Sequence, residues 1–418
     1  MAASAGALTP QTHELPNGLR IRLLPDNRAK VLAYQTYFRV GSRNERIGRT
    51  GIAHLFEHMM FNGATRYGPK EFDRQLEAHG GSSNAYTSTD LTVYHEEVPS
   101  EALDLVIDLE ADRMAGLRLS DESLQSERQV VKEERRLRVE DSVFGRLDEE
   151  LGSLIFQAHP YHWPVIGWMN DLDRITLEDC QAFFRRCYAP NNATVYLAGD
   201  FDPASTLEKL KRAYGSLPPG PGMDPVPNDE PPQHGQRRVE LQIPSQNAAL
   251  LLGFRGVPAT DRLAGALDLL SMILTFGDGS LLVRELVHKK QLCTEVSSDH
   301  GWRIDSGVFM LAAELAADSS IKRVERVILE QLAELAANPV KPALLERAKA
   351  QLRVVLLRER QTALGRCHVL GNCEHLLGGL GEAEKQYERL RAVTPKTIRE
   401  AAEAVFKVGQ STMVWVDP

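Results

Sequence analysis

The sequence predicts an α+β protein made of two similar domains, each an antiparallel-rich sheet packed with helices. Three observations support this prediction. The chain has 418 residues, and chains of this length usually fold into more than one domain, each with its own hydrophobic core. A proline-rich segment divides it into halves of similar length. Each half opens with strand patterns and closes with a helix followed by a strand, so we expect an internal duplication.

The dividing segment is LPPGPGMDPVPNDEPPQHG, residues 217–235, which carries seven prolines in nineteen residues. Proline cannot donate a backbone hydrogen bond to a helix or a sheet, so this composition predicts an extended linker. We therefore expect one domain at residues 1–216. A linker at 217–236 and a homologous second domain at 237–418 follow it.

The two halves begin and end in similar ways. The first opens with HELPNGLRIRLLP, residues 13–25, which predicts a hairpin turning at Pro16-Asn17-Gly18. The next segment, VLAYQTYFRV at 31–40, has an alternating pattern that predicts a strand. The second half opens with a comparable strand pattern. Thr176 and Thr394 precede the two closing helices, where a threonine hydroxyl can cap the first turn.

The composition excludes several classes of function. Hydrophobic residues make up 43% and charged residues 25%, as in ordinary globular proteins. The net charge of −8 argues against a nucleic-acid or anionic-membrane partner, which would favour a basic surface. No apolar run reaches the length of about 18 residues needed to span a bilayer. The five cysteines are too few, and odd in number, so we expect no disulfide framework.

The first ten residues, MAASAGALTP, contain neither the basic nor the apolar region of a signal peptide, but they are rich in small residues. A mature chain has this composition just after its cleavage site. We therefore expect a periplasmic protein whose signal peptide has been removed. The alternative is a plain cytoplasmic N-terminus.

The segment GIAHLFEHMMFNG, residues 51–63, contains the pattern H-x-x-E-H. It should be helical from 51 to 61, with Thr50 able to cap it. On a helix, His54 and His58 are four residues apart and point the same way, as two imidazole ligands of one metal must. Glu57 shares their face. Chance produces such a pattern in roughly a few per cent of chains with this many histidines, so the motif alone leaves two unrelated surface histidines as the alternative.

A catalytic zinc needs a third protein ligand and an open coordination position. The candidates lie in DESLQSERQVVKEERRLRVED, residues 121–141, which reads as one long charged helix. Glu127 and Glu134 are seven residues apart, two turns along one face. A solvated helix face is the alternative interpretation of such a charge run.

Several of these motifs, in this order, resemble the pitrilysin, insulysin and mitochondrial processing peptidase family, the inverzincins. They are HLFEH at 54–58, ERQVVKEE at 127–134, GGSSNAYTSTDLTVY at 80–94, HPYHWPVIGW at 159–168 and YAPNNATVYLAGD at 188–200. The resemblance covers nearly the whole chain. It implies a zinc metallopeptidase with one Zn²⁺ per chain. Residues 1–216 would then be the zinc-binding catalytic domain, and residues 237–418 a homologous non-catalytic domain.

The resemblance also assigns roles to individual residues. It implies that His54, His58 and Glu134 bind zinc and that Glu57 is the general base. Glu127 would be a second carboxylate that orients a ligand histidine. Residues 82–87 resemble the family's edge strand, which holds an extended peptide by β-augmentation. Its implied substrate-binding positions are Asn84, Ala85, Tyr86 and Thr87.

The second half departs from the family pattern. The family has an Arg and, seven residues later, a Tyr that reach the substrate. The matching stretch here is SLLVRELVHKKQLCTEVSS, residues 280–298, with Val287 and Thr294 at those positions. Oxyanion donors typically contribute a few kcal/mol to catalysis. We therefore expect a heterodimer in which a related subunit, itself lacking H-x-x-E-H, supplies the Arg and Tyr.

Two alternatives stay open. The chain could be a non-catalytic scaffold subunit of the same family, although its complete set of candidate site residues argues against this. It could also be a self-sufficient homodimeric peptidase in which Arg284, one helical turn away, takes the role of the missing Arg. The second half carries no ligand set of its own, because Ala348 and Val355 fall where Glu127 and Glu134 would be.

Overall fold

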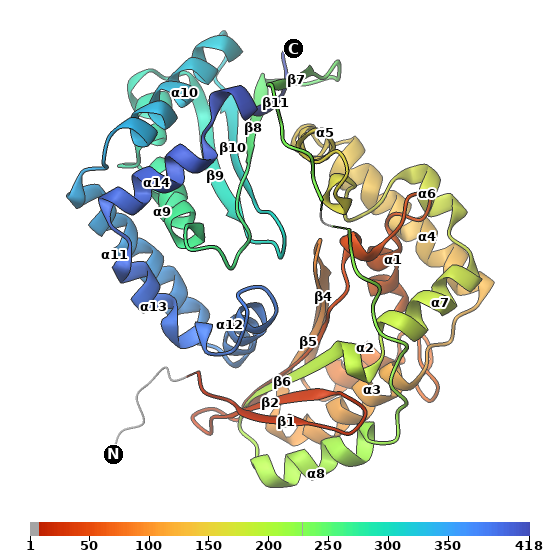
Figure 1. The fold of residues 1–418 in the computed structure, drawn as a ribbon. Helices are drawn as coiled ribbons and strands as arrows, with labels where there is room; N and C mark the ends of the chain where they lie inside the picture. The colour runs from red at the N-terminus through yellow and green to blue at the C-terminus, as the bar shows by residue number, and fades with distance from the viewer. Residues whose placement is uncertain (1–7, 228) are drawn as a thin grey trace, which may run out of the picture.

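The computed structural model describes residues 8–227 and 229–418, and it contains two β-sheets, one from each half of the chain (Figure 1). Helices pack against both sheets, so the two-domain α+β fold expected from the sequence is confirmed. The N-terminal residues on which the signal-peptide prediction rests, 1–7, lie outside the described residues. Among those that are described, no helix is both long and apolar enough to cross a bilayer.

The first sheet has six strands in the order β1-β2-β6-β3-β5-β4. They are β1 (Gln11–Glu14), β2 (Arg20–Pro25), β3 (Val31–Phe38), β4 (Ser82–Thr87), β5 (Thr92–Pro99) and β6 (Ala193–Gly199). β1 and β2 form the expected hairpin, and Gly18 supplies the positive φ of 85° that its turn requires. β4 lies at the edge and pairs only with β5, so one side of its backbone is open to another strand.

The second sheet repeats the design of the first. Its five strands, in the order β7-β11-β8-β10-β9, are β7 (Arg237–Glu240), β8 (Ala249–Arg255), β9 (Cys293–Gly301), β10 (Val308–Leu315) and β11 (Thr412–Val416). This order corresponds strand for strand to β2-β6-β3-β5-β4. The directions also correspond, because β2–β6 and β7–β11 are the parallel pairs and the other neighbours are antiparallel. The expected internal duplication is therefore visible in the topology.

The described residues form eight α-helices in the first half and six in the second. The first half has α1 (Ile52–Met59), α2 (Glu71–Ala78), α3 (Leu103–Ala115), α4 (Asp121–Arg135), α5 (Val143–Ile155), α6 (Met169–Arg174), α7 (Leu177–Cys187) and α8 (Pro203–Tyr214). The second has α9 (Ala264–Thr275), α10 (Ile321–Ala337), α11 (Pro342–Glu359), α12 (Ala363–His375), α13 (Glu382–Ala392) and α14 (Pro395–Val405). Thr176 and Thr394 cap α7 and α14 with capping boxes, as expected.

Each half gives one helix to the other half's sheet (Figure 1). α5 of the first half packs on β8 and β11, where Leu147 and Leu151 meet the second sheet. Its counterpart α12 packs on β3 and β6 of the first sheet, with Cys367 and Leu370 in the contact. The strand expected at 31–40 is confirmed as β3, and because α12 covers its second face, β3 is buried on both faces. The exchange joins the halves through two apolar interfaces.

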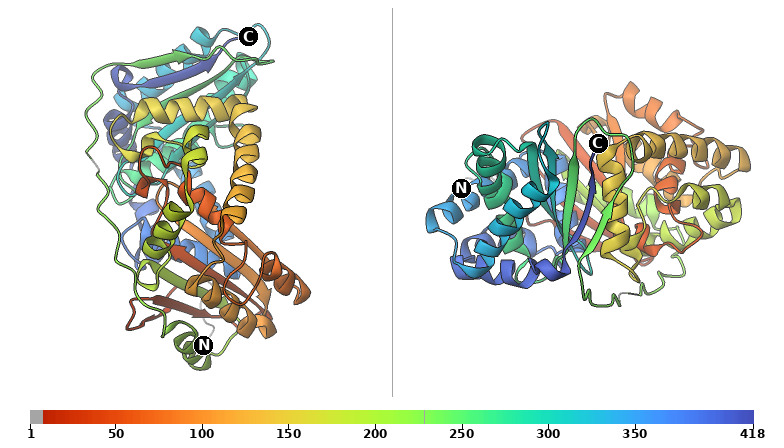
Figure 2. Two further views of the ribbon diagram at one scale, coloured as in Figure 1. Left: turned by 90° about the vertical axis from the view of Figure 1, so that its right-hand side faces the viewer. Right: turned by 90° about the horizontal axis from the view of Figure 1, so that it is seen from above.

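The proline-rich segment runs along the outside of the molecule from the first half to the second (Figure 2). It forms no regular structure over most of its length, as expected of a linker, but it is attached to the body. The carboxylate of Glu230 accepts hydrogen bonds from the backbone N–H groups of Gln157, Ala158 and His159 at 2.8–2.9 Å. All five cysteines are buried as free thiols, in agreement with the absence of a disulfide framework.

Candidate metal centre

The first turn of α1 is capped by Glu45, which lies upstream of the helix. Its carboxylate accepts hydrogen bonds from the backbone N–H groups of Gly51 and Ala53, both at 2.8 Å. The cap predicted at Thr50 is wrong, because the Thr50 hydroxyl donates instead to Asp171 at 2.8 Å. Gly51 occupies the N-cap position with φ 87°, a conformation in which a β-branched residue would be strained. The helix covers 52–59, slightly less than the expected 51–61.

α1 is apolar on one side and polar on the other. Ile52, Leu55, Phe56 and Met59 enter the core beneath the first sheet. The opposite side, which carries the two histidines and Glu57, faces α4, the helix against which α1 packs. The helical spacing read from the sequence therefore places the three polar side chains on one face, as expected.

α4 presents its glutamates to α1 because its other face is anchored in the core by Leu124 and Val131. Ser120 caps its first turn. The α-helix ends at Arg135 and continues without a break as a π-helical turn, η3 (Arg136–Glu140), so the helix expected over 121–141 is confirmed with a changed last turn. Arg138, on this turn, pairs with Oε1 of Glu134 at 3.1 Å and leaves Oε2 to face α1.

The side chains of His54, His58 and Glu134 converge, with one ligand atom of each lying within 4.8 Å of the others. Glu134 Oε2 is 3.2 Å from Nε2 of His58 and 3.6 Å from Nε2 of His54. On the other side of the His58 ring, Nδ1 lies 3.5 Å from Oε2 of Glu127. The structure thus brings together the three residues proposed as ligands, and it places Glu127 beside one of them.

These three residues fit a zinc ion. Two atoms bound to zinc at about 2.0–2.2 Å in a tetrahedral arrangement lie about 3.3 Å apart, between the two separations that the structure shows. Glu134 Oε2 is also buried without a hydrogen-bond partner among the described residues. A buried carboxylate oxygen without a partner is costly unless something positive binds it. A metal held by two imidazoles and one carboxylate would satisfy this oxygen.

Burial shapes the electrostatics of the centre. It lowers the pKa of His54 to about 4, against the opposing effect of Glu134. It also disfavours the charged form of His58, but Glu127 and Glu134 outweigh it and raise that pKa to about 9. Burial raises the pKa of Glu57, and a hydrogen bond from Thr87 lowers it. A carboxylate with a raised pKa is a stronger base, which suits proton abstraction near neutral pH.

The predicted edge strand borders the same centre. The hydroxyl of Thr87 donates to Oε2 of Glu57 at 2.6 Å. Ala85 packs on the α1 side of the sheet. Tyr86 faces α12, where its hydroxyl lies 3.4 Å from Nδ1 of His368. Asn84 accepts a hydrogen bond from the Ala85 N–H through its own side chain. Thr87 was expected to bind substrate, and the structure additionally connects it to the candidate base.

Comparisons with known proteins agree with this arrangement. Residues 22–167 match the family described as Insulinase (Peptidase family M16), and residues 174–352 match the Peptidase M16 inactive domain. The chain is 30% identical to the zinc protease PqqE of Helicobacter pylori over 97% of this chain and 92% of that protein. The chain belongs to peptidase family M16. An uncharacterized zinc protease of Streptomyces coelicolor is 27% identical over 96% of this M16 chain and 88% of its own length.

Solved structures show the same fold. The crystal structure of a protease from Helicobacter pylori superposes on this M16 chain with a TM-score of 0.93 and 29% identity, covering 98% of this chain and all of that one. A peptidase M16 inactive domain from Pseudomonas fluorescens gives a TM-score of 0.88 at 20% identity, over 98% of each chain. The family resemblance inferred from the sequence motifs is therefore confirmed.

The M16 chain has a cavity of about 630 Å³ beside the candidate metal centre, which we call the metal cavity. Its lining includes the two histidines, Glu57, Glu134 and the edge strand. Sequence reasoning missed Tyr161, Asp148 and Arg303, which also line it. Arg303 comes from the second half, more than 160 residues after the last candidate ligand, Glu134, so no local pattern could place it there. Tyr161 and the neighbouring His162 lie in a stretch that resembles the family, but their contacts depend on the tertiary fold.

The two positions at which this chain lacks the Arg and Tyr of the family pattern lie away from the cavity. Val287, on the π-helical segment η6 (Val283–Lys289), packs against the core of the second half. Thr294 is exposed on β9 and donates to the backbone carbonyl of Glu314. Arg284 lies 3.7 Å from Glu285 and is 46% exposed. Within the described residues of this single chain, the lining of the cavity includes neither Arg284 nor Val287 nor Thr294.

Proposed function

We propose that this protein is a zinc endopeptidase that hydrolyses extended peptides. His54, His58 and Glu134 would hold one Zn²⁺ per chain. The observation that carries the proposal is the carboxylate oxygen of Glu134, which is buried, lacks a hydrogen bond within the described structure, and faces two imidazole nitrogens at 3.2 and 3.6 Å. The names of the relatives, which are called zinc proteases, support the same metal.

Zinc bound there would act as a Lewis acid that lowers the pKa of a water and polarises the scissile carbonyl. The chain itself would supply the base. Glu57 lies on the face of α1 that carries the histidines and lines the cavity, so it can accept a proton from a water in that cavity. Glu127, beside Nδ1 of His58, would fix the orientation of this imidazole so that Nε2 points at the metal.

The open edge of β4 suits an extended peptide. A substrate paired with residues 82–87 would have its side chains alternate between the metal side, where Thr87 lies, and the α12 side, where Tyr86 lies. Hydrogen bonds between main chains depend little on the side chains of the peptide, so we expect extended oligopeptides of varied sequence as substrates.

We further propose that the active form is a heterodimer. Val287 cannot donate to an oxyanion, and Thr294 is too short to replace a tyrosine. A related subunit carrying the Arg and Tyr would supply these groups, and we expect that subunit to lack H-x-x-E-H. The match of residues 174–352 to a domain described as inactive agrees with a non-catalytic second half. A homodimer that uses Arg284, or a scaffold without activity, are the alternatives. The small residues at the N-terminus favour the periplasm, which cell fractionation would test.

The test is cleavage of a quenched fluorescent peptide by the purified chain with zinc, alone and after addition of a related chain from the same organism. We expect activity only in the mixture, abolished by Glu57→Gln. Full activity of the chain alone would contradict the heterodimer, and its loss in Arg284→Met would then favour the homodimer. If neither cleavage nor bound zinc were found in any case, the chain would be a non-catalytic scaffold subunit.

A further inference from the structure

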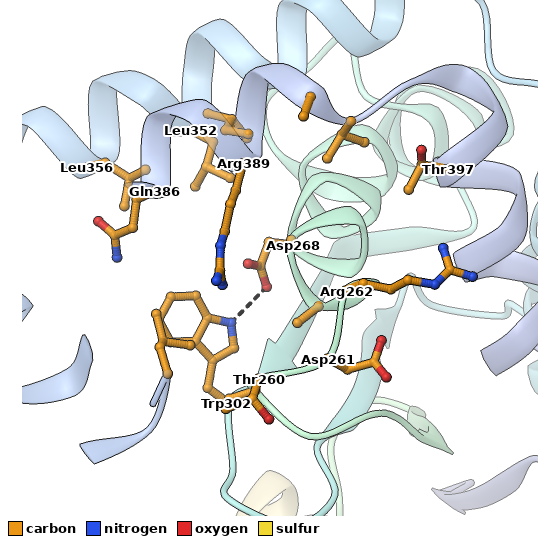
Figure 3. Close-up of a pocket in the computed structure, with 17 residues that line it drawn as sticks. Thr260, Asp261, Arg262, Asp268, Trp302, Leu352, Leu356, Gln386, Arg389 and Thr397 are labelled. Atoms are coloured by element: carbon orange, nitrogen blue, oxygen red, sulfur yellow. Dashed lines mark hydrogen bonds between the residues drawn. The ribbon is translucent and has the colours of Figure 1, made fainter. Parts of the chain in front are cut away.

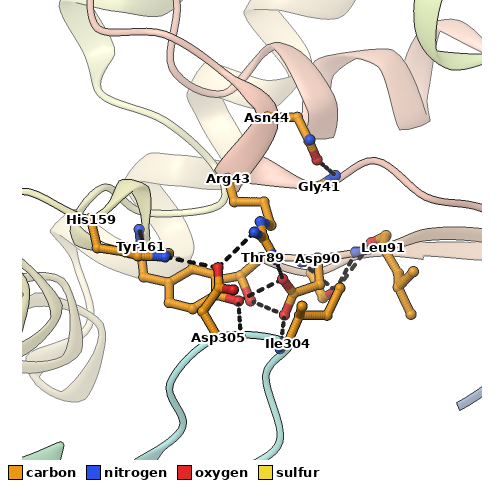
Figure 4. Close-up of polar contacts among 11 residues, drawn as sticks. Gly41, Arg43, Asn44, Thr89, Asp90, Leu91, His159, Tyr161, Ile304 and Asp305 are labelled. Atoms are coloured by element: carbon orange, nitrogen blue, oxygen red, sulfur yellow. Dashed lines mark hydrogen bonds and ion pairs between the residues drawn. The ribbon is translucent and has the colours of Figure 1, made fainter. Parts of the chain in front are cut away.

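The β9–β10 hairpin of the second half is fixed against the first half beside the metal cavity (Figure 4). At its tip, the backbone N–H of Ile304 donates to Asp90 at 3.2 Å. The carboxylate of Asp305 lies 2.6 Å from the guanidinium of Arg43 and 2.9 Å from Nε2 of His159. These contacts join the hairpin tip to the first half. The contact with Asp90 reaches the turn between β4 and β5, so it sets the position of the tip relative to the edge strand.

The residues before the tip are held from the opposite side. The indole N–H of Trp302 donates to Asp268 on α9 at 3.0 Å, within a pocket of the second half (Figure 3). The backbone carbonyl of Arg303 accepts a hydrogen bond from Ala259 at 2.9 Å. Trp302 and Arg303 are adjacent, but one lines a pocket of the second half and the other lines the metal cavity. The backbone that carries Arg303 is therefore constrained on both sides.

The guanidinium of Arg303 lies against two neighbouring aromatic rings. It is 4.9 Å from the ring centroid of Tyr161 and 5.6 Å from that of Phe156, and the two centroids are 5.5 Å apart. Among the described residues it makes no hydrogen bond or ion pair through its guanidinium, and the carboxylates of Asp90 and Asp148 act on it only from beyond 4.0 Å. Of the residues that line the cavity with His54 and Glu57, Arg303 alone comes from the second half. The side chain is thus ordered by stacking while its N–H donors remain available.

We propose that Arg303 is a specificity-determining residue that binds a carboxylate of the peptide in the metal cavity. This inference rests on the proposed function, because it concerns the substrate of the same site. A planar guanidinium binds a carboxylate through two parallel hydrogen bonds. Stacking on Tyr161 and Phe156 orders the group before binding, which reduces the entropy lost on association. The carboxylate could be an acidic side chain of the peptide or its C-terminus.

A purely structural role for Arg303 predicts a different result. If the guanidinium served only to cover the two rings, its replacement by a methionine of similar length would alter stability and would weaken all peptides equally. If it binds a carboxylate, the replacement would selectively weaken peptides that carry one. Asp148 lines the same cavity, and its carboxylate would repel a peptide carboxylate placed near it. The position of the preferred acidic residue along the peptide would therefore be restricted.

The experiment measures peptide binding by fluorescence anisotropy in zinc-loaded Glu57→Gln protein, in which cleavage is prevented. Peptides are compared in matched pairs, with Glu against Gln at each position and a free C-terminus against an amide. The Arg303→Met and Arg303→Lys changes are introduced on this background. Arg326→Met serves as the control, because it removes an exposed arginine of α10 that lies outside the cavity. Thermal unfolding of each variant is measured in parallel, and the lysine variant maintains the test if the methionine variant fails to fold.

We expect one kind of carboxylate to strengthen binding by about tenfold, as a charged hydrogen-bonded pair typically does. Arg303→Met should abolish this preference, Arg303→Lys should keep part of it, and Arg326→Met should leave it intact. The Glu/Gln pairs and the acid/amide pairs distinguish a side chain from the C-terminus. A preference that persists in Arg303→Met, or is absent in the parent protein, would overturn the inference. Selective binding without cleavage by the parent chain and its partner would instead refute the proposed function alone.

Discussion

The hydrogen bond between Thr87 and Glu57 offers a direct test of which residue is the base. Thr87→Val removes the hydroxyl that donates to Glu57 Oε2 at 2.6 Å and keeps the side-chain shape. Valine is β-branched like threonine and suits a strand, so β4 should keep its conformation. The change is therefore largely confined to the environment of one carboxylate.

The sign and the size of the effect follow from that hydrogen bond. It favours the charged form of Glu57 and so lowers its pKa, against burial, which raises it. Without it the pKa rises, and the ionised base is present only at higher pH. A hydrogen bond to a charged group contributes about 1.5–3 kcal/mol, and tenfold in rate corresponds to about 1.4 kcal/mol. Because the bond borders an open cavity, we take the lower value and expect about a tenfold loss of kcat/KM on the acid side.

The assay is the pH profile of kcat/KM in the active assembly, with Thr89→Val as the control. Thr89 lines the same cavity but contacts Asp90 instead of Glu57. We expect the acid limb to move to higher pH in Thr87→Val, with the plateau at high pH preserved, and no movement in the control. An equal loss at every pH would refute the reasoning and would indicate that Thr87 acts only by holding the peptide.

Three further predictions concern the metal and the contact between the halves. Glu127→Ala should weaken zinc binding about 10–100-fold in calorimetric titration, because His58 loses the group that orients it. Chelation should lower the melting temperature, and zinc at a hundred times its Kd should restore about 2.7 kcal/mol of stability, but not in His58→Ala. Asp305→Ala should reduce the free energy of unfolding in urea by about 2–3 kcal/mol, since Arg43 and His159 lose a shared partner. A smaller loss than about 1 kcal/mol would contradict the proposed importance of this contact.

The features predicted correctly from the sequence depend on neighbouring residues. The caps at Thr176 and Thr394 require a hydroxyl beside the first turn of a helix, which a short pattern reveals. The candidate metal-binding face of α1 requires only the helical period, which places His54 and His58 together. The third candidate ligand, Glu134, was found because the resemblance to the family supplied a long-range relationship that periodicity alone does not contain.

The features that were missed depend on tertiary packing. Thr50 is a suitable cap by its residue type, but Asp171, from a distant helix, takes its hydroxyl, and Glu45 caps α1 instead. The strand at 31–40 was expected, but its pattern does not reveal that α12, more than 300 residues later, covers it. Arg303 has no local feature that distinguishes it from other arginines. Each of these contacts joins residues whose proximity is decided only when the halves pack together.

The packing of the halves also clarifies what the second half contributes. In α11, Ala348 and Val355 occupy the positions that correspond to Glu127 and Glu134 in α4, so this half has no ligand set there. It nevertheless covers the first sheet with α12, and it supplies Arg303 to the metal cavity. A half that only enclosed the substrate would need neither contact. The second half therefore shapes the candidate active site from within the same chain, whichever subunit supplies the missing Arg and Tyr.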